Sequence, residues 1–195
     1  LLMTPVFLLG DPAARRALGR SGTLGENLTI HPAAHVLAMH HEPVRSFTKI
    51  PQGYAIEEFH REGLLMEGVY TPLDLGAATL TPLGPFFTAA MEGYERLASF
   101  GFMVEDEGRG VVRPSPLLPG MSPGPRRPVI TYRVGDRDAA RVKRGIEILA
   151  RLFLRVGAQV VLPLVQGFDE IRDEAGLGRL RAARLRPRDF ELTAY

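Results

Sequence analysis

Five histidines are the side chains of this 195-residue sequence whose type best suits metal binding or proton transfer. His31 and His35 are four residues apart, which is the spacing of a zinc-binding helix, but Pro32 lies between them and no acidic partner follows in register. His40 and His41 are adjacent, so in a strand they point to opposite faces. Because this spacing places no third ligand, the sequence predicts no metal site.

Other catalytic patterns are missing from the sequence as well. It contains no cysteine and no Gly-x-Ser-x-Gly elbow, which excludes a thiolate nucleophile and the usual serine-hydrolase turn. Residues 105–107 are three consecutive acids at a predicted turn, and we interpret them as a solvated loop tip. Residues 22–25 carry two glycines but precede a strand-like run, so they do not match a phosphate-binding loop. Spacing alone therefore identifies no catalytic centre.

The overall composition is that of a globular protein with an ordinary core. Hydrophobic residues make up 45% of the chain, and no apolar run is long enough to span a bilayer. The net charge is +2, and the arginines are scattered except at 179–188, whereas phosphate-binding surfaces concentrate their charge. The first residues lack the basic start of a signal peptide. We therefore expect a cytoplasmic location, no nucleic-acid partner and no membrane span.

The strongest structural signal is an amphipathic helix over residues 136–157. Its apolar positions recur at steps of four and three, which places them on one stripe of a helix. Asp136 or Asp138 can cap its start, and Gly157 can adopt the left-handed turn at its end. The stripe consists of Val142, Ile146, Leu149, Phe153 and Val156. It must be buried, and the surrounding strand-like segments indicate that it packs on a β-sheet.

Short strand-like runs joined by turn residues fill much of the remaining sequence. The predicted strands are 33–40, a hairpin of 53–59 with 63–70, a hairpin of 102–105 with 110–113, 128–133, 160–162 and the final run 190–195. A second helix is predicted from about residue 87, with its end near Gly101. This pattern predicts an α+β fold, with an antiparallel β-sheet, helices packed on one face and the other face open. An open, partly apolar face can serve as the wall of a ligand pocket or bind a partner domain.

Four sequence blocks in a fixed order carry a family resemblance. They are residues 4–9 (TPVFLL), 25–32 (GENLTIHP), 97–104 (LASFGFMV) with 108–113 (GRGVVR), and 190–195 (FELTAY). Together they resemble the glucose–methanol–choline (GMC) family of flavin-dependent oxidoreductases, in particular bacterial members that act on bulky alcohols. The second block is similar to the family's Gly-x-Asn-Leu-x-x-His-Pro block, and the likeness covers nearly the whole length.

The resemblance also implies what lies outside the chain. The dinucleotide motif Gly-x-Gly-x-x-Gly and the His-Pro segment with the family's catalytic histidine are both missing, and both ends look cut. We therefore expect the substrate-binding part of a longer enzyme, with its open sheet face toward a missing flavin domain. Residues 1–32 would be the tail end of the flavin-binding domain with a connecting loop, 33–185 the substrate-binding α+β domain, and 186–195 a strand returning toward the flavin domain.

In the family, a histidine base takes the alcohol proton while FAD takes hydride from the carbon. The resemblance implies that Asn27 and His31 lie near the flavin and that Phe102 and Met103 contact the substrate, a small apolar or bulky alcohol. The alternatives are core packing for Phe102 and Met103, a backbone-capping role for Asn27 and a hydrogen-bonded loop position for His31. No catalytic residue is expected in this chain, which alone should be inactive.

Two other readings remain open at this level. The first is a free-standing binding module for an apolar ligand, without catalysis. The second is a basic interaction domain, which requires the arginines to gather in one patch.

Overall fold

The computed structural model describes residues 2–18, 23–80, 84–116 and 127–194. They form two compact units. The first consists of Leu1–Ile30 and Asp106–Gly135, and the second of His31–Glu105 and Asp136–Tyr195. Each unit therefore combines segments that are far apart in the sequence, and each is described by itself below.

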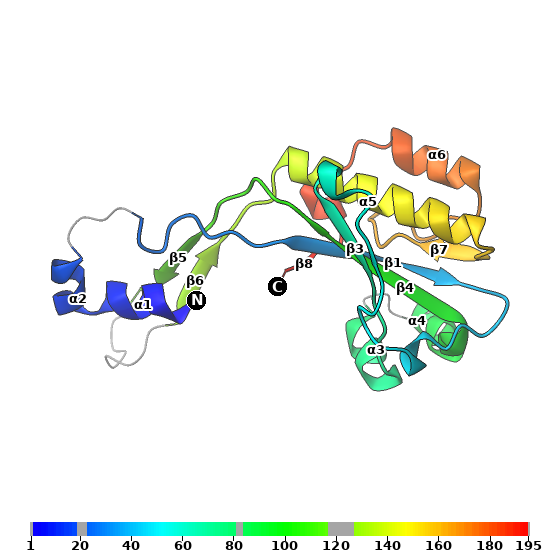
Figure 1. The fold of residues 1–195 in the computed structure, drawn as a ribbon, viewed down its shortest axis with the longest axis horizontal. Coiled ribbons are helices and arrows are strands. Elements are labelled where there is room, and N and C mark those ends of the chain that lie inside the picture. The colour runs from blue at the N-terminus through cyan, green and yellow to red at the C-terminus, as the bar shows by residue number, and fades with distance from the viewer. Residues whose placement is uncertain (1, 19–22, 81–83, 117–126, 195) are drawn as a thin grey trace. The chain divides into compact units, whose positions relative to one another are not determined.

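The second unit is built on an antiparallel sheet with the order β2-β3-β4-β1-β7 (Figure 1). The sequence predicted an antiparallel sheet, but not this strand order. Its strands are β1 (Pro32–Met39), β2 (Ala55–Ile56), β3 (Leu64–Gly68), β4 (Leu97–Val104), β7 (Val160–Leu162) and β8 (Thr193–Ala194). β4 pairs with β1 along its whole length. On the opposite edge of β1, β8 pairs with its beginning and β7 with its end. The predicted hairpin around residues 60–62 is confirmed as β2 and β3.

β1 divides the second unit into two faces because its side chains alternate along the strand. Ala34, Val36 and Ala38 are buried in the main core. His35 and Leu37 point to the other face of the sheet. Most side chains of β1 are buried on both faces, which explains why the strand is largely apolar, with His35 as its one polar residue.

The long helix α5 (Asp136–Arg155) covers the first face, and its predicted stripe is largely confirmed. Val142, Ile146 and Leu149 are all at most 1% exposed in the core. Gly157 ends the helix with φ +87°, as the helix-end pattern predicted. The prediction for Val156 was wrong: it lies beyond the last helical residue and is 60% exposed. The shorter helix α6 (Glu174–Ala182), which the sequence analysis did not predict, packs beside α5.

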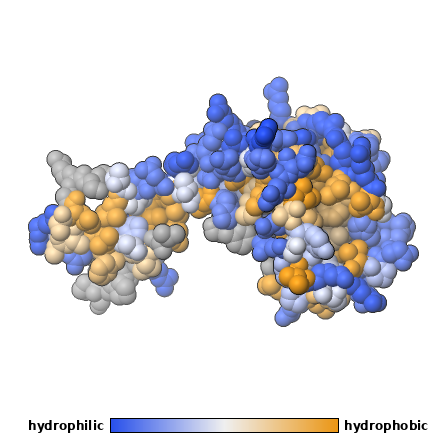
Figure 2. Space-filling model, viewed as in Figure 1, coloured by the Kyte–Doolittle hydropathy of each residue, from blue (hydrophilic) through white to orange (hydrophobic). Residues whose placement is uncertain are grey.

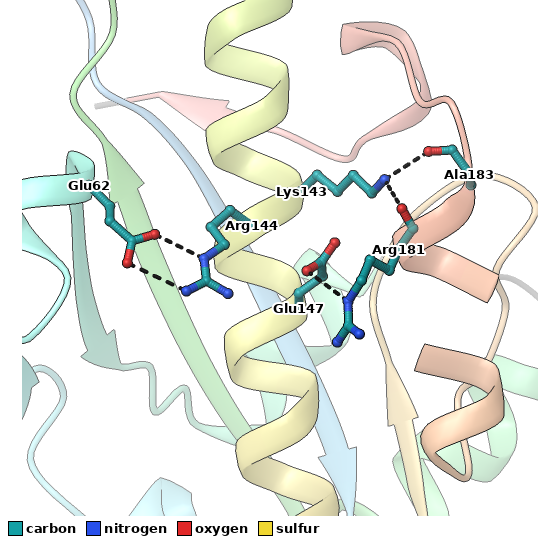
Figure 3. A network of polar contacts seen from close by, with 6 residues as sticks. All are labelled: Glu62, Lys143, Arg144, Glu147, Arg181 and Ala183. Carbon is teal, nitrogen blue, oxygen red and sulfur yellow. Dashed lines mark hydrogen bonds and ion pairs between the residues drawn. The ribbon is translucent and has the colours of Figure 1, made fainter. Parts of the chain in front are cut away.

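Polar contacts on both sides of α5 hold this helix in place (Figure 3). On one side Arg144 donates a hydrogen bond of 2.9 Å to the carboxylate of Glu62, before β3. On the other side Lys143 donates to backbone carbonyl groups at the end of α6, and Glu147 pairs with Arg181 at 3.6 Å. Arg144, Glu62 and Arg181 are substantially exposed, so we attribute to these contacts the orientation of α5 rather than much of the stability.

The predicted second helix is shorter than expected and lies at the margin of the opposite face. α4 runs only over Pro85–Glu92, because Gly93 ends it and the chain enters β4 at Leu97 after a short 3-10 turn. Met91 packs against the cluster of Leu37, Tyr94, Leu97 and Leu162, on the face away from α5. α3 (Leu73–Thr79) was not among the predicted helices. The 3-10 turns are Ser46–Thr48, His60–Glu62, Tyr94–Arg96 and Pro187–Asp189.

The first unit contains α1 (Met3–Gly10), α2 (Pro12–Ala17), β5 (Val111–Pro114) and β6 (Pro128–Thr131). β5 pairs with β6, so the predicted hairpin of 102–105 with 110–113 is wrong. β4 instead has long partners on both edges, which satisfy its backbone groups and leave none for β5. The predicted strand 128–133 is confirmed as β6, and residues 4–9, the first sequence block, lie in α1.

Candidate functional site

A pocket of about 760 Å³ opens on the sheet face that points away from α5, entirely within the second unit. This volume lies within the range of roughly 300–1,000 Å³ that is usual for small-molecule sites. Alternate residues of two neighbouring strands form its floor. They are Ala33, His35 and Leu37 of β1, and Ser99, Gly101 and Met103 of β4.

One wall of the pocket is apolar and is formed by α3, with Leu75 and the nearby Leu80. Tyr94 holds this wall in place. Its hydroxyl group donates a hydrogen bond of 2.8 Å to the backbone carbonyl of Thr71, just before α3. The Tyr94 ring packs so closely on Gly76 that a Cβ atom there would collide with it. The glycine therefore allows α3 to lie directly against the aromatic ring.

Polar groups gather along the rest of the lining. Glu67 of β3 accepts a hydrogen bond of 2.8 Å from the side-chain amide of Gln52. Glu191, just before β8, lies on the other side of the floor beside β1. Between them, in register across the strands, are Gly101 of β4 and His35 of β1. The pocket thus combines one apolar wall with a floor that carries two carboxylates and an imidazole.

The His35 side chain is mostly buried, and its pKa lies below the ordinary value of 6.5. Burial is the main cause, because it disfavours the charged imidazolium, and the negative charge of Glu191 opposes the effect. His35 is therefore neutral near pH 7 and can both donate and accept a hydrogen bond.

The two predicted substrate residues lie on opposite faces of β4. Met103 lines the pocket and is opposite Ala33 in the sheet. Phe102 borders the pocket, but it is only 2% exposed and its ring packs against Gly145 of α5. The structure therefore brings Met103, but not the Phe102 ring, to the floor of the cavity.

The two predicted flavin contacts lie in different units. His31 is exposed at the beginning of β1 and contributes to the pocket rim. Asn27 is exposed in the first unit and has a left-handed backbone, with φ +57°. Its loop is fixed on β5, since Leu28 exchanges backbone hydrogen bonds with Gly110, and the Gly25 carbonyl accepts one from Val112 at 2.7 Å. The beginning of the second sequence block thus packs against residues 108–113 of the third block in this unit.

Sequence reasoning missed Glu67, Tyr94 and Glu191 as lining residues and considered His35 only as a metal ligand. Alternation along β1 could have placed His35 on the same face as Ala33 and Leu37. No local pattern could have brought it to Glu191, near the other end of the chain. In the described ranges no group of three or more His, Asp or Glu side chains is arranged to hold a metal ion. None of the helices described combines the length and apolarity needed to cross a membrane.

Comparison with known proteins finds relatives that are named as oxidoreductases. No protein-family model matches it. It is 28% identical over 182 residues to an uncharacterised GMC-type oxidoreductase of Mycobacterium tuberculosis, found in two strains. It is 27% identical over 161 residues to an uncharacterised GMC-type oxidoreductase of Sinorhizobium fredii. The matches cover 93% and 81% of this chain, but only 27% and 30% of those relatives. The chain is therefore a relative of the GMC-type oxidoreductases, as its four sequence blocks predicted, and corresponds to less than a third of such a protein.

Proposed function

We propose that this chain forms the substrate-binding part of an FAD-dependent oxidoreductase that transfers hydride from an alcohol CH–OH group to the flavin. The observation that carries the proposal is the pocket of about 760 Å³ on the face of the sheet away from α5, in a relative of GMC-type oxidoreductases. The histidine base of the reaction belongs to a part of the enzyme outside these 195 residues.

The pocket suits an alcohol with a bulky apolar body. Leu37, Val69, Leu75 and Met103 offer apolar surface to such a body. Burying this surface contributes about 25 cal/mol per Å² to binding. The polar residues of the floor can receive the hydroxyl group, and the walls exclude water from it. Phe102 supports the pocket from the opposite face of the sheet. Its ring fills the space between β4 and α5 and so fixes the strand that carries Met103.

The residues present fit a peripheral role in binding FAD. The sequence has no Gly-x-Gly-x-x-Gly loop, so it lacks the usual cradle for the dinucleotide phosphates. The exposed amide of Asn27, on a loop fixed by β5, and the exposed imidazole of His31 can each contact a flavin held by another domain. When bound, the flavin supplies the hydride acceptor. The chain itself binds and orients the alcohol.

Exposed apolar side chains in the first unit support a partner domain in the same protein. Met3 and Phe7 of α1 are 52% and 69% exposed, and Val129 and Ile130 of β6 are 44% and 45% exposed. Figure 2 shows apolar residues gathered at the surface around these elements. Such a patch is typical of a surface that another domain covers. In this proposal residues 1–32 end the flavin-binding domain, 33–185 bind substrate, and 186–195 return toward the flavin domain.

The test uses the protein as its gene encodes it, including any segments that flank this chain. We expect a yellow preparation that releases FAD on denaturation and loses its flavin absorbance when benzyl alcohol is added without oxygen. Toluene, which lacks the hydroxyl group, should leave the absorbance unchanged. The 195-residue chain alone should be colourless and inactive. A flavin-free protein, or a flavin that no alcohol reduces, would overturn the proposal.

A free-standing binding module for an apolar ligand is the second candidate. It is supported by the fact that all lining residues in the part of the chain that the structure describes belong to one unit. Binding of both benzyl alcohol and toluene by a protein without flavin would favour this function over the oxidoreductase.

A further inference from the structure

His35 lies at the centre of the pocket floor, and its ring faces the negative charge of Glu191. Among the described residues, no hydrogen bond involves either ring nitrogen of His35. In the same part of the chain no buried side-chain nitrogen or oxygen atom lacks a partner. The ring nitrogens are therefore not sealed in the core but reach the cavity. A polar group in such a position is available to a bound molecule.

The neighbours of His35 define which group it can receive. Across the strand lies Gly101, where a Cβ atom would be 2.8 Å from Cγ2 of Val69, so Val69 covers this part of the floor. The side of His35 toward β4 is thus apolar. The charged or titratable groups among the described lining residues are, besides His35, Glu191, Glu67, His31 and Tyr94. The α3 wall contributes Leu75 and Leu80 but no charge.

The charge of the lining is opposite in sign to that of the whole chain. The described lining residues include two glutamates and no lysine or arginine, whereas the chain carries a net charge of +2. These glutamates repel a carboxylate or phosphate on the ligand, at a cost that grows as the site loses water. A neutral hydroxyl group avoids this repulsion and can hydrogen-bond to an uncharged imidazole.

We propose that His35 anchors the substrate through a hydrogen bond to its hydroxyl group, and that Glu67 and Glu191 exclude substrates with an anionic group. This inference rests on the proposed function and specifies the substrate class, namely neutral alcohols with an apolar body. Hydroxy acids and phosphorylated alcohols are rejected. In this proposal His35 binds and positions the substrate but accepts neither the proton nor the hydride. Both are transferred to groups outside this chain.

The test compares ligands that differ only in the polar group, in the protein as its gene encodes it. The probes are benzyl alcohol, toluene and 4-(hydroxymethyl)benzoate, and binding is measured by titration. In His35→Phe the Kd for benzyl alcohol should rise about tenfold, which corresponds to the loss of one hydrogen bond. The Kd for toluene should stay unchanged, because it makes no such bond. His35→Gln, which retains hydrogen-bonding atoms, should recover part of the affinity.

A matched control and a charge variant complete the experiment. His40 follows β1, contacts the ring of Phe153 at 6.2 Å between centroids, and does not line the pocket. His40→Phe should therefore leave all three affinities unchanged. Glu67→Gln should improve binding of 4-(hydroxymethyl)benzoate by about threefold or more and hardly affect benzyl alcohol.

Three results would overturn the inference. They are an equal loss of benzyl alcohol and toluene binding in His35→Phe, an unchanged Kd for benzyl alcohol in that variant, or no binding of either ligand by the unmodified protein. Failure of the proposed function is a separate result: the hydroxyl-specific effect of His35 would persist, but no flavin would be reduced.

Discussion

At the scale of single residues, a neutral imidazole in the pocket floor connects stability with ligand binding. The pKa of both His35 and His40 is lowered, in each case mainly by burial. A histidine that is neutral in the folded protein and protonated in the unfolded chain makes folding depend on pH. Only His35 lies in the pocket, so the two histidines share a titration behaviour but not a binding role.

The first prediction concerns this dependence on pH. Because the folded-state pKa of His35 lies below 6.5, its contribution to stability is fully present above about pH 6.5 and is lost as the pH falls through the folded-state pKa. The melting temperature should therefore decrease between about pH 7 and about pH 5. In His35→Gln this decrease should be smaller, because the titrating group is gone. An identical pH profile in both proteins would contradict the lowered pKa.

The second prediction concerns the hydroxyl group that fixes α3. Tyr94→Phe removes the donor to the Thr71 carbonyl and should reduce the free energy of unfolding by about 1–2 kcal/mol. Tyr54→Phe is the control, because Tyr54 is 78% exposed, and it should change stability by less than about 0.5 kcal/mol. Urea denaturation measures both values. Equal effects of the two substitutions would show that the Tyr94 hydroxyl does not hold the wall.

At the scale of elements, two glycines in neighbouring helices should respond to alanine with opposite sign. In α5 a Cβ atom on Gly145 would collide with the ring of Phe102. Gly145→Ala should therefore destabilise the fold by about 1–3 kcal/mol, despite its better helix propensity. In α6 nothing lies within 4 Å of a Cβ atom on Gly178. Gly178→Ala should stabilise the fold by up to about 1 kcal/mol.

Thermal and urea unfolding of both alanine variants give these differences. If Gly145→Ala is neutral or stabilising, Phe102 is not packed against α5 as described. In that case Phe102 could still turn toward the pocket as a substrate contact, as the sequence analysis predicted.

Elements with a complete local signal were predictable from the sequence. The stripe of α5, its end at Gly157 and the strand that became β1 all follow from periodicity and turn residues. The prediction of a hairpin between 102–105 and 110–113 was wrong because long-range strand pairing overrides the local signal. Both edges of β4 are paired, one with β1 and the other with β3. Val156 fits the helical stripe but follows the last helical residue. Hydrophobic spacing does not show where a helix ends.

The site was less predictable than the fold, because its residues meet only through long-range pairing. Met103 and His31 were named from the family resemblance, and both line the pocket. Their predicted contacts with substrate and flavin remain predictions. Glu191 reaches the pocket because β8 pairs with β1, although most of the sequence lies between these two strands. No local pattern indicates that pairing.

At the scale of the whole molecule, the proposed function separates the pocket that binds the substrate from the groups that carry out oxidation. Its relatives extend well beyond the matched region, since the matches cover 27–30% of their length. The exposed apolar residues of α1 and β6 form a surface against which another domain of the same protein can pack. A separation of substrate binding from the flavin site is consistent with these facts and with the missing dinucleotide motif.

The most direct test of this account is the rate of anaerobic flavin reduction by benzyl alcohol in two tryptophan variants of the protein as its gene encodes it. Leu75 lines the pocket, whereas Leu73, in the same helix and similarly exposed, does not. Leu75→Trp should fill the cavity and slow flavin reduction by about tenfold or more, and Leu73→Trp should leave the rate unchanged. Equal rates in the two variants would show that the alcohol does not bind in this pocket.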